Sequence, residues 1–328
     1  MNSKKINITE IVDEVNIENS ALLCCSSFEE RSASLPFIFS KQNFKSISIF
    51  KNENLHHKID KNALIIHEYY DNNVTIINTK IDDPLLTASR IKDVISSLVK
   101  NNIKNLIIDI TTFTHEMLLI LFMNVYKMKK HFNDVQCLYL GAKDYSVNEK
   151  MEEKWLSKGC KSIRSVIGYP GKLLPGIPIC LTVLVGYEHE RALIMIEEMD
   201  PEYLILGKGK PSDESLTNPS HKAPMLYFQN ILDDFISRRN ETSSFDFSCS
   251  ELESTYKKIK EKIHEKKDMN HIIVPLNTKI STLAAGIVAL ENTSIQICYS
   301  EPETYNFSGY STPDNNVTII NNVLEMFE

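Results

Sequence analysis

Two short stretches of this sequence place hydroxyl, carboxylate and guanidinium groups directly after an apolar run. In the first, Ser26 and Ser27 follow the apolar residues 21–25, and Glu30 and Arg31 come shortly after. Arginine can bind a phosphate through two parallel hydrogen bonds, and serine hydroxyls can bind its oxygens. We therefore expect Ser26, Ser27 and Arg31 to bind a phosphate-containing small molecule. The alternatives are that Arg31 forms only a surface pair with Glu30 or an inter-subunit contact.

The second stretch repeats this pattern after the apolar residues 181–185. Tyr187 and Arg191 are its candidate ligand-binding residues, although Glu188 and Arg191 could equally form an i, i+3 pair on a helix. Carboxylates at such a position suit a ribose hydroxyl, a base edge or acid–base catalysis. If the protein is an enzyme, Glu30 and Glu190 are its candidate catalytic carboxylates.

A third candidate region follows the apolar residues 106–110, which Asp109 interrupts. Burying an unpaired charge costs free energy, so Asp109 needs a partner, either loop N–H groups or a ligand. Thr111 and Thr112 offer hydroxyls and amides at the start of a helix. His115 is equally a residue of a helix face or an acid or base. Because no second histidine follows His115 at the required spacing, the metal-binding motif H-E-x-x-H is excluded, and we expect no metal.

Thr278 and Lys279 stand at another expected helix start, where they could grip a phosphate unless Lys279 is simply solvated. The basic loop 207–210 matches neither the dinucleotide-binding glycine pattern nor the P-loop. The sequence therefore predicts no dinucleotide or other cofactor.

Apolar runs of strand type alternate with helical patterns along the whole chain. This alternation predicts an α/β fold with mostly parallel sheets, which bind ligands outside the carboxyl ends of their strands. We expect a loop over residues 28–32 and a helix from about Ser34, since serine caps helices well and Pro36 then falls in the first turn. The expected strands are 21–26, 46–50, 74–78, 106–110, 135–141, 181–185, 203–206, 271–276, 294–299 and 317–320.

The length of 328 residues favours two domains. Because the pattern of the first part recurs in the second, we expect two tandem Rossmann-like units: residues 1–145, a connector at 146–178, and residues 179–328 with a helical insertion at about 212–268. On this hypothesis Arg31 and Arg191 face a common hollow. The alternative is one large α/β sheet.

Composition excludes several classes of protein. The net charge of -7 argues against binding of long nucleic acids, which requires a positive face. The most apolar run, residues 117–123, is too short to span a membrane. Seven cysteines without a C-x-x-C pair, and a start that lacks the apolar region of a signal peptide, favour a reduced cytoplasm.

Residues 107–112, Ile-Ile-Asp-Ile-Thr-Thr, resemble the CRISPR-associated Rossmann fold (CARF) sensor domains. In that family an apolar strand followed by Asp-x-Thr contributes to a pocket for cyclic oligonucleotides. The resemblance covers mainly residues 20–145 and implies that residues 26–31 line the same pocket. The family's usual glycines and lysine are replaced here by Thr112, Phe113 and His115, whereas residues 278–279 are closer to its pattern. A tandem of such units is similar to the SAVED-type sensors of antiviral signalling.

Three functional hypotheses follow. The first is a nucleotide-binding sensor or regulatory protein of prokaryotic antiviral defence. The second is a hydrolase that cleaves a nucleotide or an NAD-like molecule with Glu30 or Glu190. The third is an interaction scaffold for a partner effector enzyme. The sequence is also compatible with a homodimer.

Overall fold

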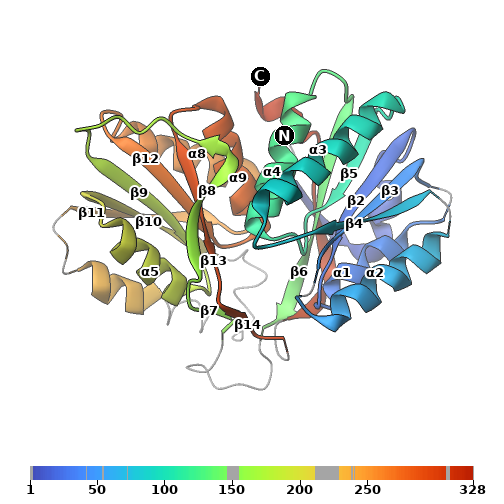
Figure 1. Cartoon of the computed structure of the whole chain (residues 1–328), viewed down its shortest axis with the longest axis horizontal. Helices are drawn as coiled ribbons and strands as arrows, with labels where there is room; N and C mark the ends of the chain where they lie inside the picture. The colour runs from blue at the N-terminus through green and yellow to red at the C-terminus, as the bar shows by residue number, and fades with distance from the viewer. Residues whose placement is uncertain are drawn as a thin grey trace. The chain divides into compact units, whose positions relative to one another are not determined.

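The computed structural model describes residues 3–327 except 42, 54, 72, 146–154, 211–228, 238, 240 and 308–310. The chain divides into two compact units, each described here by itself (Figure 1). Unit 1 comprises Met1–Asp144 and Ser311–Glu328, and unit 2 comprises Tyr145–Tyr310.

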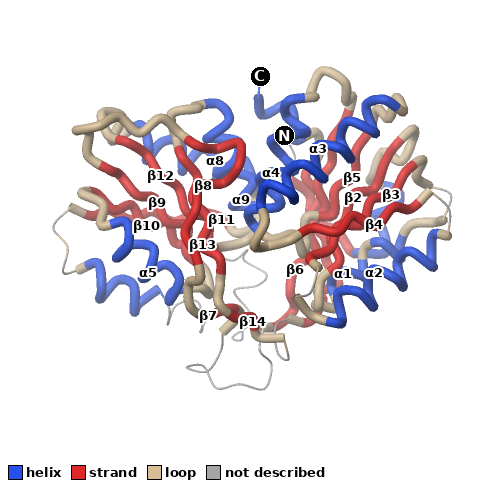
Figure 2. The backbone as a smooth tube through the Cα atoms, in the orientation of Figure 1, coloured by secondary structure: helices blue, strands red, loops and turns tan. Residues whose placement is uncertain are grey.

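Unit 1 contains a sheet that, among the described residues, has seven strands in the order β1-β15-β6-β5-β2-β3-β4. Strands β2 to β6 are parallel to one another, and β15 is antiparallel to both of its neighbours, β6 and β1. Figure 2 shows the strands of this sheet in red. The strands are β1 (Ser3–Asn7), β2 (Ser20–Ser26), β3 (Ser46–Asn52), β4 (Val74–Thr79), β5 (Asn105–Asp109), β6 (Asp134–Asp144) and β15 (Thr312–Ile320). The helices are α1 (Arg31–Ser34), α2 (His57–Tyr70), α3 (Pro84–Lys100) and α4 (His115–Lys127), with 3-10 turns η1 (Ile8–Asp13), η2 (Pro36–Ile38) and η4 (Val323–Phe327).

The described part of unit 2 contains a six-stranded sheet in the order β11-β10-β9-β12-β13-β8. Only β8 is antiparallel to its neighbour within this sheet. The strands are β8 (Ser162–Pro170), β9 (Ile179–Val185), β10 (Tyr203–Lys210), β11 (Thr242–Ser248), β12 (Asn270–Leu276) and β13 (Gln296–Glu301), and the helices are α5 (His189–Met199), α8 (Leu252–His264) and α9 (Lys279–Glu291). A separate two-stranded ladder joins β7 (Ser157–Lys158) to β14 (Thr304–Tyr305).

Both units share one topology. If the parallel strands of each unit are numbered along the chain, both sheets have the order 3-2-1-4-5, with an antiparallel strand beside the fifth. The order therefore reverses between β2 and β5 in unit 1 and between β9 and β12 in unit 2. These are the switch points at which open α/β sheets bind ligands. The predicted fold of two Rossmann-like units with mostly parallel sheets is confirmed, and a single large sheet is excluded.

The boundaries of the units differ from those expected. Strand β15, expected to close the second unit, pairs with β6 and β1 in the first sheet. Strand β8 falls in the expected connector, yet it pairs with β13 in the second sheet. The reason is that the residues of β15 pack into the first sheet, as Val317 and Ile319 do in the core of unit 1.

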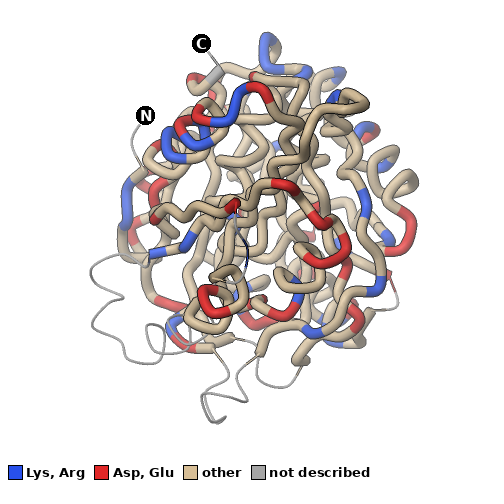
Figure 3. Tube along the Cα trace, turned by 90° about the vertical axis from the view of Figure 1, so that its left-hand side faces the viewer, with Lys and Arg blue, Asp and Glu red and all other residues tan. Residues whose placement is uncertain are grey.

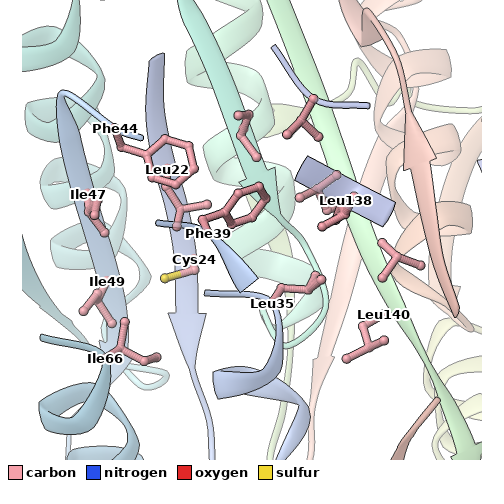
Figure 4. Close-up of a cluster of buried hydrophobic side chains, with 14 of the residues drawn as sticks. Leu22, Cys24, Leu35, Phe39, Phe44, Ile47, Ile49, Ile66, Leu138 and Leu140 are labelled. Carbon is pink, nitrogen blue, oxygen red and sulfur yellow. The ribbon is translucent and has the colours of Figure 1, made fainter. Parts of the chain in front are cut away.

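Local sequence signals explain why the elements form. All seven residues of β2 are buried, as expected of a central parallel strand. Helix α3 begins with Pro84, and the side chain of Asp83 accepts from the backbone N–H of Leu86. One face of the unit 1 sheet packs against α2 and the segment around Phe39, and Figure 4 shows Leu22 within this cluster. The switch-point loops therefore start from a rigid, buried sheet.

Two expected elements were wrong in detail. The helix expected near Ser34 begins at Arg31, and a 3-10 turn follows at Pro36. The predicted helical insertion contains strand β11, which extends the sheet beside β10. Residues 211–228, which include the start of that insertion, lie outside the described residues. Within the described residues, no helix is long and apolar enough to cross a membrane.

Candidate functional site

The switch point of unit 1 brings together the loops that follow β2 and β5. The hydroxyl of Thr112 donates to the backbone carbonyl of Cys25 at 2.6 Å, which joins the two strand ends. The Ser26 hydroxyl donates to the carbonyl of Ile59 in α2 at 2.7 Å. Ser27 and Thr112 are both buried. The sequence-predicted residues of unit 1 therefore do gather at one sheet edge, but several of their hydroxyls bond the protein itself.

Arg31 is buried and bonded to protein groups. Its Nε and Nη2 atoms donate to the Oε2 atom of Glu29 at 3.0 and 2.5 Å. Its Nη1 atom donates to the carbonyl of Leu140 in β6 at 3.1 Å. The expected surface pair of Arg31 with Glu30 is wrong, because Glu30 is exposed whereas Glu29 is buried beside the guanidinium. Arg31 thus ties the loop after the first strand to the fifth strand of the sheet.

Asp109 is 2% exposed at the end of β5. Burial raises the pKa of its carboxyl group to about 6, although hydrogen bonds from Thr111 and the charge of Arg31 act in the opposite direction. The backbone N–H of Thr111 donates to the Asp109 carboxylate at 3.0 Å, so the loop supplies the expected partner. The Thr111 hydroxyl accepts from the N–H of Leu140 at 3.0 Å. Asp109 is therefore a carboxyl group that changes charge near neutral pH.

The first turn of α4 carries an acid. Thr114 caps this helix by accepting from the N–H of Met117 at 3.2 Å, and His115 and Glu116 follow, both buried. An acidic side chain in the first turn already complements the positive end of the helix dipole. The unit 1 switch point therefore offers hydroxyls and carboxyl groups rather than a free positive charge.

Arg191 has the same surroundings in unit 2 as Arg31 has in unit 1. Its guanidinium group donates to Glu188 and to the carbonyl of Ser300 in β13, and it lies 5.8 Å from the ring centroid of Tyr299. Its Nη1 atom also donates to the hydroxyl of Ser157 at 3.3 Å. The predicted i, i+3 pair of Glu188 and Arg191 is confirmed. Both arginines are almost fully buried, at 4% and 2% exposed, which makes them part of the scaffold of each switch point.

The start of α9 differs from that of α4. Thr278 caps α9 by accepting from the N–H of Ser281 at 3.3 Å, and Lys279 is the first residue of the helix. Helix α9, which is described along its whole length, has no acidic residue in its first turn. Thr278 and Lys279 are both half-buried. A positive helix end with an adjacent lysine is the arrangement that attracts an anion.

Asn277 organises the loop before α9. Its side-chain nitrogen donates to the carbonyl of Val185 at the end of β9 at 2.6 Å, and its oxygen accepts from the N–H of Thr278, also at 2.6 Å. A Cβ atom at Gly186 would lie 2.9 Å from the Asn277 side-chain nitrogen, and one at Gly209 would meet the same atom. Both positions therefore require glycine so that Asn277 can bridge the strand ends.

The remaining candidate residues lie at the surface or nearer to it. Glu30 and Glu190 are exposed, and Tyr187 is half-buried with its ring 4.8 Å from that of Tyr145. In the view of Figure 3, residues of both charge signs are scattered along the tube among uncharged ones. Within the described residues, no group of three or more metal-ligating side chains is close enough to hold a metal ion.

Sequence reasoning missed the groups that accept hydrogen bonds from the two buried arginines. Leu140 and Ser300 contribute backbone carbonyls, which no side-chain motif reveals. Ser311 and Ser157 lie 282 and 31 residues from the carboxylates that they bond. One feature of the sequence did point to these strands. Tyr299 and Tyr139 occupy matching positions in the expected strands of the two units.

Comparison with known proteins adds little. No family model matches the chain, and neither does any curated protein. Two solved structures from Pseudomonas aeruginosa are similar. One, from strain UCBPP-PA14, is described as a candidate universal stress protein, with 12% identity, coverage of 87% of this chain and 94% of that chain, and a TM-score of 0.27. The other, a functionally unknown protein of strain PAO1, has 10% identity, coverage of 86% and 92%, and a TM-score of 0.26. The Rossmann-like α/β fold is assigned from the strand order itself.

Proposed function

We propose that the protein binds a nucleotide-type small molecule at the switch points of its Rossmann-like units and acts as a sensor or regulator in prokaryotic antiviral defence. The observation that carries the proposal is the start of α9, where Thr278 and Lys279 stand at the switch point of unit 2. The defence role rests on the resemblance of residues 107–112 to CARF sensor domains.

The α9 start suits the phosphate of such a ligand. The first backbone N–H groups of a helix lack helical partners and point toward an anion. The N–H of Ser281 is already capped by Thr278. The positive end of the helix dipole and the charge of Lys279 in the first turn both favour a phosphate at this helix start. Because Asn277 is fixed by Val185, the loop is held in place before a ligand arrives.

The unit 1 switch point suits the sugar or base of a nucleotide. Asp109 has a pKa of about 6, so its carboxyl group can accept or donate a hydrogen bond near neutral pH. Thr111, Thr112 and His115 surround the same strand end. These neutral and acidic groups complement hydroxyl groups and base edges better than phosphate.

The buried arginines support the site rather than contact the ligand. Each guanidinium group holds a carboxylate of the switch-point loop against the fifth strand of its sheet. The carboxylates of Glu29 and Glu188 are thus held in ion pairs with buried arginines and belong to the scaffold of each switch point.

The test is isothermal titration calorimetry with a panel of ATP, NAD⁺, a cyclic dinucleotide and a cyclic oligoadenylate. We expect saturable binding of at least one compound, and Lys279→Ala to weaken it by about tenfold through the loss of one charge-assisted contact. The matched control is Lys267→Ala, which removes an exposed lysine after α8. Absence of binding by folded protein across the panel would contradict the proposal, as would equal losses in both variants.

A further inference from the structure

In each unit an antiparallel strand lies beside the fifth parallel strand. In unit 2 this strand is β8, which pairs with β13 and lies at the start of the continuous segment that forms the unit. In unit 1 it is β15, which pairs with β6 although the whole of unit 2 separates the two strands in the chain. The sheet of unit 1 is therefore completed by a strand that returns from the far end of the sequence.

A buried cluster holds the incoming end of β15. The hydroxyl of Ser311, the residue directly before β15, donates to the Oε2 atom of Glu29 at 2.5 Å. The same oxygen accepts from Arg31, which also binds the carbonyl of Leu140 in β6. We call Glu29, Arg31 and Ser311 the first latch. It joins the switch-point loop, the fifth strand and the incoming strand.

Unit 2 contains an equivalent cluster. The hydroxyl of Ser157, a residue of β7 shortly before β8 in the chain, donates to Glu188. Glu188 is paired with Arg191, which binds the carbonyl of Ser300 in β13. We call Glu188, Arg191 and Ser157 the second latch. Ser157 lies in the same continuous segment of chain as its glutamate and arginine, whereas Ser311 of the first latch follows the whole of unit 2.

The backbone pairing of β15 is weakest where its latch acts. Its register with β6 shifts between Thr312 and Pro313 and again between Pro313 and Val317, so the ladder is irregular at the end next to Ser311. The corresponding end of β8 pairs regularly with β13 from Ser162 to Arg164, and Arg164 adds an ion pair to Glu301. Strand β15 therefore depends on the first latch more than β8 depends on the second latch.

From these contacts we propose that each latch controls docking of the antiparallel strand beside the fifth parallel strand in its own unit, and that the first latch dominates. The switch-point loop of unit 1 is thereby connected mechanically to the C-terminal strand. A change that separates Glu29 from Ser311 frees the irregular end of β15, while the regular part, Val317–Ile320, keeps its pairing with β6. This proposal is independent of any ligand.

Hydrogen exchange followed by mass spectrometry tests the proposal on the full-length protein. We expect Ser311→Ala to speed exchange of residues 312–316 by about tenfold, the loss of one partly buried hydrogen bond to a charged group, without changing residues 317–320 or 162–170. Ser157→Ala should speed exchange of residues 162–170 by a smaller factor. Ser311→Thr keeps the hydroxyl and should retain slow exchange, and Ser294→Ala, at an exposed serine, is the matched control.

Two outcomes would overturn the proposal. One is exchange of residues 312–316 in Ser311→Ala within a factor of about two of the unaltered protein, since a lost charged-group hydrogen bond exceeds that factor. The other is faster exchange of residues 312–316 and 162–170 together in either single variant, which would mean that the strands do not respond separately. Glu29→Gln provides a second variant, because it keeps the side-chain size while removing the charge that the serine and arginine bind.

Discussion

The two switch points have the same scaffold and opposite electrostatics. In both, a buried arginine ties a glutamate to a carbonyl of the fifth strand. Beside that scaffold, unit 1 has the buried acid Asp109 and an acid in the first turn of α4, whereas unit 2 has Lys279 at the start of α9. Shared topology therefore gives both units the same switch-point scaffold, while a few residues after the fourth parallel strand set the charge beside it.

The largest expected effect concerns the buried arginines that both switch points share. Arg31→Ala and Arg191→Ala should each lower the free energy of unfolding by about 3–5 kcal/mol, because each leaves a buried carboxylate without its partner. Urea denaturation measures this change. The control Arg90→Ala removes a half-buried arginine that binds a carbonyl, and should cost only about 1 kcal/mol. If Arg31→Ala and Arg191→Ala lower the free energy of unfolding by no more than the control does, neither arginine stabilises the fold.

The second prediction concerns Asp109, which has no acidic counterpart at the end of β12. Since its pKa is raised from 3.8 to about 6, the folded protein binds this proton more tightly than the unfolded chain. The free energy of unfolding should therefore fall as the pH rises from 3.8 to about 6, by about 3 kcal/mol from this group. Asp109→Asn should remove that fall and stabilise the protein at pH 7. Denaturation at several pH values measures it, and an unchanged pH profile would refute the assignment.

A smaller change in stability is expected from substituting glycines, and it should differ between Gly209 in unit 2 and Gly141 in unit 1. Gly209→Ala should cost about 1–3 kcal/mol, because the new Cβ would meet Asn277 and lie 2.8 Å from the sulfur of Cys249. In an Asn277→Ala background the same substitution should cost less. Gly141→Ala in β6 meets only Asp314 at 3.7 Å and should change stability by less than about 0.5 kcal/mol. Equal costs at both glycines would argue against the bridging role of Asn277.

Much of the fold could be predicted from the sequence, since its signals are local. The apolar run of β2 and the Asp-Pro start of α3 each specify their element with nearby residues. The pairing of β15 in unit 1 could not be predicted, because β15 and β6 are far apart in the sequence and nothing local distinguishes one sheet edge from another. Helix α2 was not predicted either, and its N-terminal cap is the side chain of His56, an unusual capping residue.

The candidate site was predictable in place and less so in detail. The sequence located both switch-point loops, because hydroxyl and charged residues follow apolar runs there. It could not show that Arg31 turns inward to Glu29 and Leu140, since that depends on the start of α1 and on a backbone carbonyl of a distant strand. A guanidinium group next to a loop predicts an anion partner, and here a protein carboxylate fills that role.

The most direct test of the central claim is hydrogen exchange with and without a saturating nucleotide from the binding panel. The account predicts slower exchange at the first turn of α9, residues 279–282, and in the loop 186–188. Protection confined to other parts of the chain, with these two segments unchanged at saturation, would contradict a ligand site at the switch point of unit 2.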